Sequence, residues 1–242
     1  MFGGSLPPVV KNLMIINGLM YLAAISLPQT TGIDIYEKMA LYPIDSAQFH
    51  PIQFITHLFL HSKYDFGHIL ANMFMLFILG IHLERAWGSQ KFLIYYLLTG
   101  FGAATLHVLV IQYQISEIAQ NVDQQALTQV INEGRNILLQ NKQFIDPSLA
   151  KLNLLYNIPT VGASGAVFGV LLAFGMLWPN MTFYFYFLFP IKAKYFITIY
   201  ALAELCMGVF NRPGDNVAHF AHLGGMLFGF IILKYWKAQK AQ

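Results

Sequence analysis

Six long apolar stretches constrain this chain more than any other feature. A helix needs about 20 mostly apolar residues to cross the hydrocarbon of a bilayer. Charged residues make up only 10% of the 242 residues, whereas a soluble domain carries roughly 25%. We therefore predict an all-α polytopic membrane protein, a single six-helix membrane domain over residues 1–242. The predicted spans are Val9–Leu27, His68–Trp87, Lys91–Tyr113, Ala163–Trp178, Lys194–Phe210 and Val217–Trp236.

The basic residues predict the orientation, because short cytoplasmic segments of membrane proteins collect Lys and Arg. With both termini in the cytoplasm, the short inner segments contain Lys11, Arg85, Lys91, Lys192, Lys194, Lys234, Lys237 and Lys240. These residues lie at membrane edges, so we expect the lipid bilayer as a partner and no nucleic acid. A bacterial inner membrane is the expected location, and the sequence says nothing of the oligomeric state.

The segments between the spans are expected to differ in character. After the first span, "YEKMALY" and "PIQFITHLFLH" are typical of short interfacial helices. Residues 112–159 form an extended outer loop whose apolar spacing of three and four predicts amphipathic helices. This loop is either a tolerated insertion or a cap that contacts substrate or a partner. The aromatic run after Trp178 is too short to span and is expected to be extended or partly helical.

Polar side chains inside the predicted spans need a reason, because an unpaired polar group in a bilayer is costly. His68 and Asn72 in "HILAN" are four residues apart and share one helix face. Ser164 lies in "GASG", and His219 and His222 lie in "AHFAHLGGMLFGF". Each could instead make a packing hydrogen bond within or between helices.

The surroundings of Ser164 and His222 favour a shared site. Pro159 and Gly162 indicate that a helix begins only near Ser164. The N–H groups of its first turn would then be unpaired and could stabilise an oxyanion. Gly225 and Gly229 form a G-x-x-x-G pair, which lets another helix approach closely. The small residues around Ser164 provide a matching face, so we predict that the fourth and sixth spans pack tightly.

These motifs resemble those of the rhomboid intramembrane serine proteases. The resemblance rests on H-x-x-x-N, G-A-S-G and A-H-x-x-G-x-x-x-G, in this order on the second, fourth and sixth spans. The stretch "LERAWGSQKFLIYYLLTG" is also similar to the family's segment between the second and third spans. The family's Trp-Arg pair in the first outer loop is missing here, and "HPIQF" stands near its place. We expect that loop to brace the protein differently.

The resemblance implies an intramembrane serine endopeptidase that cuts single-span membrane proteins near the outer membrane face. Ser164 would be the nucleophile and His222 the general base. His68 and Asn72 would bind the oxyanion together with the backbone N–H of Ser164, and Phe168 would stack on the base. The partners would be transmembrane protein substrates, no cofactor and no metal are expected, and the fifth span would be the lateral gate.

No carboxylate is obviously placed to orient His222, which favours a Ser164–His222 dyad. Asp215 lies about two turns earlier, roughly 10 Å along a helix, and is interpreted as the cap of the sixth span. Glu204 in the fifth span is as consistent with a packing hydrogen bond as with a gate element. His219 receives no catalytic role.

Three other functions stay open at this stage. A metal enzyme would use histidines such as His57 and His61, which have the spacing of helical metal sites, although H-E-x-x-H is absent. An inactive rhomboid-like protein that binds membrane helices would usually lack the serine or the histidine. A small transporter would show paired broken helices in two similar halves, which are not visible.

Overall fold

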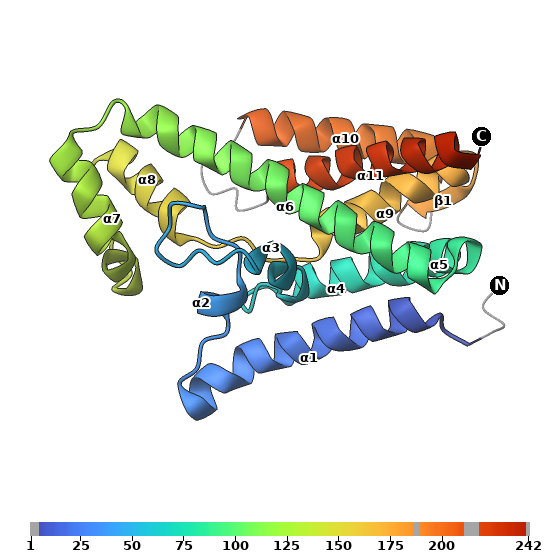
Figure 1. Cartoon of the computed structure of the whole chain (residues 1–242), viewed down its shortest axis with the longest axis horizontal. Coiled ribbons are helices and arrows are strands. Elements are labelled where there is room, and N and C mark those ends of the chain that lie inside the picture. Colours follow the sequence, from blue (N-terminus) through green and yellow to red (C-terminus); the bar gives the residue numbers. More distant parts are fainter. Residues whose placement is uncertain (1–4, 186–188, 211–217, 241–242) are drawn as a thin grey trace.

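The computed structural model describes residues 5–185, 189–210 and 218–240, and most of them are helical (Figure 1). The elements in chain order are α1 (Pro8–Thr31), α2 (Tyr36–Met39), α3 (Gln53–Thr56), η1 (His57–Phe59), α4 (Phe66–Met75), η2 (Leu76–Gly80), α5 (Ile81–Trp87), α6 (Ser89–Ala119), α7 (Gln124–Leu139), α8 (Pro147–Asn157), α9 (Ser164–Leu177), β1 (Thr182–Phe185), β2 (Phe189–Lys192), α10 (Ala193–Phe210) and α11 (His219–Lys240). The predicted all-α class is confirmed.

Each predicted span lies largely within helix, and the second one consists of α4, the π-helical turn η2 and α5. Among the described residues, α1, the α4–α5 stretch, α6 and α10 are long and apolar enough to cross a membrane. Helix α9 is apolar but shorter, and α11 is not among the helices that meet this criterion. The protein is therefore a multi-pass membrane protein, and the count of six spans stays a prediction.

Helices α6, α9 and α11 form the centre of the molecule, with the most extensive packing between α11 and the other two. Ten of the fourteen residues of α9 are buried, so this helix is surrounded by its neighbours. On α10, by contrast, the buried residues are Ala193, Ile197 and Glu204. Figure 1 shows α10 beside α11 on one side of α6, and α1 on the other side beyond α4. Helix α10 is thus a peripheral helix.

The connection between α6 and α9 contains two helices, as its amphipathic pattern predicted. Asp123 and Asp146 cap α7 and α8 by accepting hydrogen bonds from backbone N–H groups of the first turn. The two helices pack on the end of α6 through an apolar cluster built on Ile115, Val130, Leu152 and Tyr156. Helix α6 continues through Ala119, so the connection starts later than residue 112. The polar residues after Tyr113 do not break a helix, and Ile115 packs against α7 and α8.

The segment before α10 contains a short hairpin in which β1 and β2 pair antiparallel, with Thr182 opposite Lys192. The expectation of extended or partly helical structure is thus met by strands. Residues 186–188, between the two strands, lie outside the described part.

The segment between α1 and α4 is braced by Gln53, which is fully buried. Its side-chain amide donates to the carbonyl groups of Gln48, at 2.8 Å, and Lys38, at 3.3 Å. Its side-chain oxygen accepts from the backbone N–H of Tyr42 at 3.3 Å. Gln53 belongs to the "HPIQF" stretch, so a buried amide from this stretch holds the segment between α1 and α4 together.

Candidate active site

Ser164 is the first residue of α9, which confirms the predicted helix start. The first hydrogen bond of the helix joins the N–H of Val167 to the carbonyl of Ala163 at 3.0 Å. The backbone N–H groups of Ser164, Gly165 and Ala166 therefore have no partner inside the helix and lie at the positive end of its dipole. Ser164 is half-buried, whereas the residues that follow it are buried. This is a helix terminus that can accept developing negative charge.

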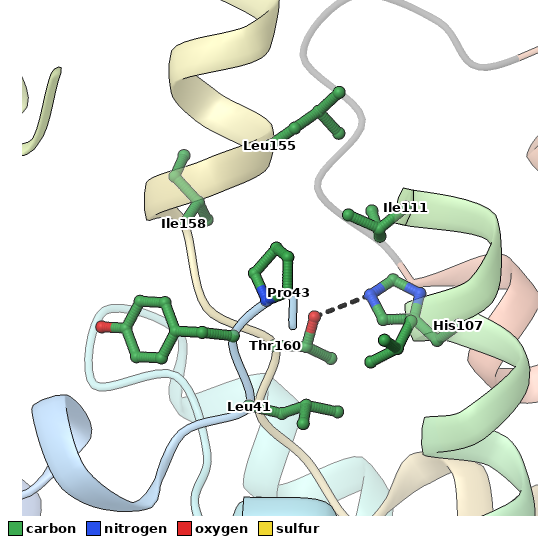
Figure 2. Close-up of a pocket in the computed structure, with 9 residues that line it drawn as sticks. Leu41, Pro43, His107, Ile111, Leu155, Ile158 and Thr160 are labelled. Atoms are coloured by element: carbon green, nitrogen blue, oxygen red, sulfur yellow. Dashed lines mark hydrogen bonds between the residues drawn. The ribbon is translucent and has the colours of Figure 1, made fainter. Parts of the chain in front are cut away.

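Backbone hydrogen bonds fix Thr160 and Gly162, which lie shortly before this helix. Thr160 and Leu41 exchange two bonds of 2.8 and 3.0 Å, and the N–H of Gly162 donates to the carbonyl of His57 at 3.0 Å. The Thr160 side chain bonds to Nε2 of His107 on α6 at 2.7 Å, as Figure 2 shows. This bond borders a small pocket lined mainly by apolar side chains, among them Leu41, Pro43, Ile111, Leu155 and Ile158. The chain therefore enters α9 from a fixed position.

The backbones of α9 and α11 approach each other at glycines. A Cβ on Gly225 would lie 1.8 Å from the carbonyl oxygen of Gly165, so only glycine fits there. A Cβ on Gly229 would lie 2.4 Å from the Tyr95 hydroxyl, which itself donates to the carbonyl of Gly169 at 2.8 Å. Gly165 follows Ser164 in the chain, so the closest approach of the two helices occurs beside the serine.

The imidazole of His222 lies between side chains from α9 and α10. The ring of Phe168 stacks on it with a centroid distance of 4.1 Å and an interplanar angle of 5°. Its Nδ1 lies 2.9 Å from Oε2 of Glu204, and Nδ1 of His219 lies 2.6 Å from the same oxygen. All three residues of this Glu204–His219–His222 cluster are buried. Because an ionised carboxylate only accepts hydrogen bonds, Nδ1 of His222 carries the proton and Nε2 is its acceptor.

His68 faces the same region from α4. A Cβ on Gly162 would lie 2.9 Å from Nε2 of His68 and 3.6 Å from Oγ of Ser164, so both atoms border one point. Nδ1 of His68 accepts from the backbone N–H of Ser62 at 3.4 Å, which leaves the proton of the neutral ring on Nε2. The His61 ring packs edge-on against His68 at a centroid distance of 5.1 Å.

Asn72, which is buried, donates from its side-chain amide to the carbonyl of His68 at 2.9 Å. An amide group has two N–H donors, so one remains for a second acceptor. Gly162 itself has a φ of +133°, a conformation that side chains rarely adopt. The structure thus brings His68 and Ser164 together around a glycine that has no room for a side chain.

Comparison with known proteins decides the family. The family model described as the Rhomboid domain matches residues 48–238. The chain belongs to the rhomboid family. It is 28% identical to RHOMBOID-like protein 4 of Arabidopsis thaliana over 165 residues, which are 68% of this chain and 29% of that protein. It is 28% identical to RHOMBOID-like protein 12, mitochondrial, of the same plant over 171 residues, 71% of this chain and 42% of that protein.

A further relative of this rhomboid chain is RHOMBOID-like protein 6, mitochondrial, of Arabidopsis thaliana, at 28% identity over 179 residues, 74% of this chain and 41% of that protein. The chain spans less than half the length of these curated relatives. Two of the three carry the word mitochondrial in their names, which does not fit the expected bacterial inner membrane.

Glu204 makes contacts with His219 and His222 that the sequence of this rhomboid did not predict. No carboxylate was obviously placed beside His222 in the sequence, and the structure places one there, because Oε2 of Glu204 accepts from Nδ1 of His222. The predicted cap Asp215 lies outside the described residues. The signal was available, since an ionisable residue within a membrane span marks a functional site by default.

The rhomboid chain also contains histidines outside the spanning helices. Burial lowers the pKa of His57 to about 4 and that of His61 to about 3. Nδ1 of His57 bonds to the carbonyl of Gln53 at 2.8 Å, which satisfies it without a metal. Within the described residues, the metal-ligand donors that gather within 4.8 Å of one another are those of the Glu204–His219–His222 cluster.

Proposed function

We propose that this rhomboid chain is an intramembrane serine endopeptidase, with Ser164 as nucleophile and His222 as general base. The observation that carries the proposal is the position of these residues on α9 and α11. Gly165 and Ala221, the neighbours of the two residues, lie in contact, since a Cβ on Gly165 would be 3.5 Å from the Ala221 carbonyl oxygen. The Phe168 ring, one turn after Ser164, stacks on His222. These contacts support a single site that contains a hydroxyl and an acceptor nitrogen.

The proposed reaction follows from these groups. Nε2 of His222 takes the proton of the Ser164 hydroxyl as its oxygen attacks the substrate carbonyl carbon. The imidazolium then gives this proton to the leaving amine, and the peptide bond breaks to leave an acyl-enzyme. Water attacks the ester in the second half of the reaction with His222 again as base, and Ser164 is released.

The oxyanion formed in each half would be stabilised by fixed donors. The candidates are the backbone N–H of Ser164 at the start of α9, Nε2–H of His68, and the second amide N–H of Asn72. Donors that are in place before the reaction cost no reorganisation, and loss of one typically lowers turnover by about 10²–10³-fold. We expect Asn72→Ala to lower kcat by about 10²-fold and to leave KM nearly unchanged. Unchanged turnover in a folded variant would contradict this role.

The proposed substrates are single-span membrane proteins, cut near the membrane face opposite the side of both termini. The Lys and Arg residues of the short segments support this orientation, because such residues collect on the cytoplasmic side, where both termini are expected. The substrate helix must unwind locally to expose a peptide bond, so we expect small or helix-breaking residues near the cut.

The test is cleavage of a labelled single-span substrate in proteoliposomes. We expect cleavage and labelling by a serine-directed phosphonate with the wild-type protein, and neither with Ser164→Ala; His222→Ala should abolish cleavage. Ser26→Ala is a matched control, because Ser26 donates to the carbonyl of Leu22 within α1 at 2.9 Å. His82→Gln is the corresponding histidine control, since its Nδ1 bonds to the carbonyl of Ile78, one turn earlier in the same predicted span. Substrate binding without cleavage or labelling by the wild-type protein would identify an inactive helix-binding protein instead.

A further inference from the structure

Glu204 is a carboxylate on a peripheral helix with its side chain almost completely removed from solvent. The residue is 3% exposed, and a single oxygen, Oε2, accepts hydrogen bonds from Nδ1 of both His222 and His219. A buried carboxylate is costly unless charge-assisted hydrogen bonds satisfy it. Two imidazole N–H donors from neighbouring turns of α11 provide them. In the proposed reaction of Ser164 and His222, neither Glu204 nor His219 has a role.

We propose that Glu204 is the positioning residue of the His222 base, and that α10 thereby contributes to the active site. The inference rests on the proposed function, because it concerns how that base is aligned. Glu204 touches neither substrate nor the reacting atoms; it acts through the imidazole ring.

Two contacts together define the orientation of the His222 ring. The stacked Phe168 ring fixes the plane of the imidazole but not its rotation within that plane. The hydrogen bond from Nδ1 to Glu204 fixes the rotation and, with it, the direction of Nε2. It also keeps the proton on Nδ1, so that Nε2 is unprotonated and can accept a proton from serine.

The charge of Glu204 supports the same step. When His222 takes a proton, the ring becomes an imidazolium, and a carboxylate 2.9 Å away stabilises it. The interaction is strong because water is largely excluded from the pair. His219 holds the other side of the Oε2 atom at 2.6 Å, one turn before His222, which keeps the carboxylate in place.

The distances favour hydrogen bonds over a metal site in the Glu204–His219–His222 cluster. Ligand atoms at about 2.0 Å from a tetrahedral zinc ion are about 3.3 Å apart. The nitrogen–oxygen distances here are 2.6 and 2.9 Å, which are hydrogen-bond lengths.

Helix α10 contributes a second side chain to this arrangement. The Tyr200 ring, one turn before Glu204, packs on Phe168 at a centroid distance of 5.0 Å, and Phe168 stacks on the base. A Cβ on Gly208, one turn after Glu204, would lie 3.1 Å from Cβ of His219, so the helices also meet closely there. The orientation of His222 therefore depends on how α10 is seated against α9 and α11.

The experiment compares Glu204→Gln and Glu204→Leu with the wild-type protein in proteoliposomes. Glutamine retains an acceptor but loses the charge, whereas leucine loses both. We expect kcat to fall about 10-fold and about 100-fold, respectively, since loss of the orienting carboxylate of a serine protease can cost up to about 10⁴-fold. KM should stay within about 2-fold, and the rate of phosphonate labelling of Ser164 should fall with kcat.

Glu84→Gln is the matched control, because Glu84 is also a buried carboxylate in a predicted span. Its two oxygens accept from the N–H groups of Val9 and Val10 at 2.9 and 2.8 Å and from the Ser89 hydroxyl at 2.7 Å, so its hydrogen-bond partners lie on α1 and α6. We expect this variant to melt earlier but to retain kcat per folded molecule. The nearly isosteric Glu204→Gln keeps the test valid if Glu204→Leu does not fold.

The outcomes separate the two proposals. Wild-type labelling rates in folded Glu204→Gln and Glu204→Leu would overturn the positioning role and leave the proposed protease intact. Absence of phosphonate labelling in the wild-type protein would overturn both. Loss of wild-type activity on treatment with a chelator would mean that the cluster holds a metal and would overturn the positioning role.

Discussion

Replacing Gly225 with alanine tests whether catalysis depends on the close approach of α9 and α11. The added Cβ would lie 1.8 Å from the carbonyl oxygen of Gly165, a backbone atom that no rotamer change can move away. A carbon and a carbonyl oxygen ordinarily approach to about 3.3 Å. The two helices must therefore separate locally by about 1.5 Å, next to Ser164 and His222.

The expected cost has two parts. Overpacking of a close contact destabilises a fold by about 1–3 kcal/mol. A misplacement of about 1 Å between reacting groups can lower the rate by about 10²-fold. We therefore expect Gly225→Ala to lower the melting temperature and to lower kcat by about 10²-fold per folded molecule, measured with the labelled substrate in proteoliposomes.

Gly18→Ala is the matched control for this substitution. Gly18 also lies within a helix, but a Cβ there would meet nothing within 4 Å. Alanine is preferred over glycine inside a helix by about 1 kcal/mol, so this variant should be at least as stable as the wild type and equally active. Full activity of Gly225→Ala would refute the argument that the glycine contact sets the distance between nucleophile and base.

Acid should destabilise the protein through His57 and His61. Burial lowers their pKa values to about 4 and about 3, so below pH 6.5 the unfolded chain binds more protons than the folded chain. The free energy of unfolding therefore decreases as the pH is lowered, by about 2 kcal/mol for each residue at pH 5. Denaturant unfolding in detergent measures this decrease. His61→Phe should remove about half of this loss, and it should not destabilise the protein at pH 7.5, because both ring nitrogens of His61 are buried without a partner among the described residues; an unchanged pH dependence would contradict this. Phe168→Leu should lower kcat by about 2- to 12-fold, since a stacked ring contributes about 0.5–1.5 kcal/mol; a change confined to KM would argue against a role beside His222.

Hydropathy was sufficient to locate the helices because a bilayer leaves the backbone no alternative to internal hydrogen bonding. It reports where the membrane ends and not where a helix ends, which explains why α6 continues past Tyr113 to Ala119. The start of α9 was predictable from local chemistry, since proline and glycine precede Ser164. That start places a serine at a helix terminus, which is the part of the site that local sequence determines.

The contacts of Glu204 depend on tertiary structure and were therefore not predictable. Whether it faces α11 or lipid depends on how α10 is rotated about its own axis, and α10 has too few buried residues to give a clear amphipathic pattern. A spacing of three residues places His219 and His222 on one helix face, but it does not indicate which group lies opposite. The orientation of His68 likewise depends on a backbone N–H from Ser62 in the preceding loop.

The backbone bonds of residues 160–162 have a consequence for how this protein can vary. They attach the entry to α9 to Leu41 and His57, in the segment between α1 and α4. The α7–α8 connection is joined to the same segment, because Arg135 of α7 pairs with Glu37. We therefore expect Ser164 to tolerate changes in this connection only where that ion pair is kept. Insertions in the stretch around residues 41–57 should disturb Ser164 most, since this stretch is remote from the serine in sequence but is bonded to the start of its helix.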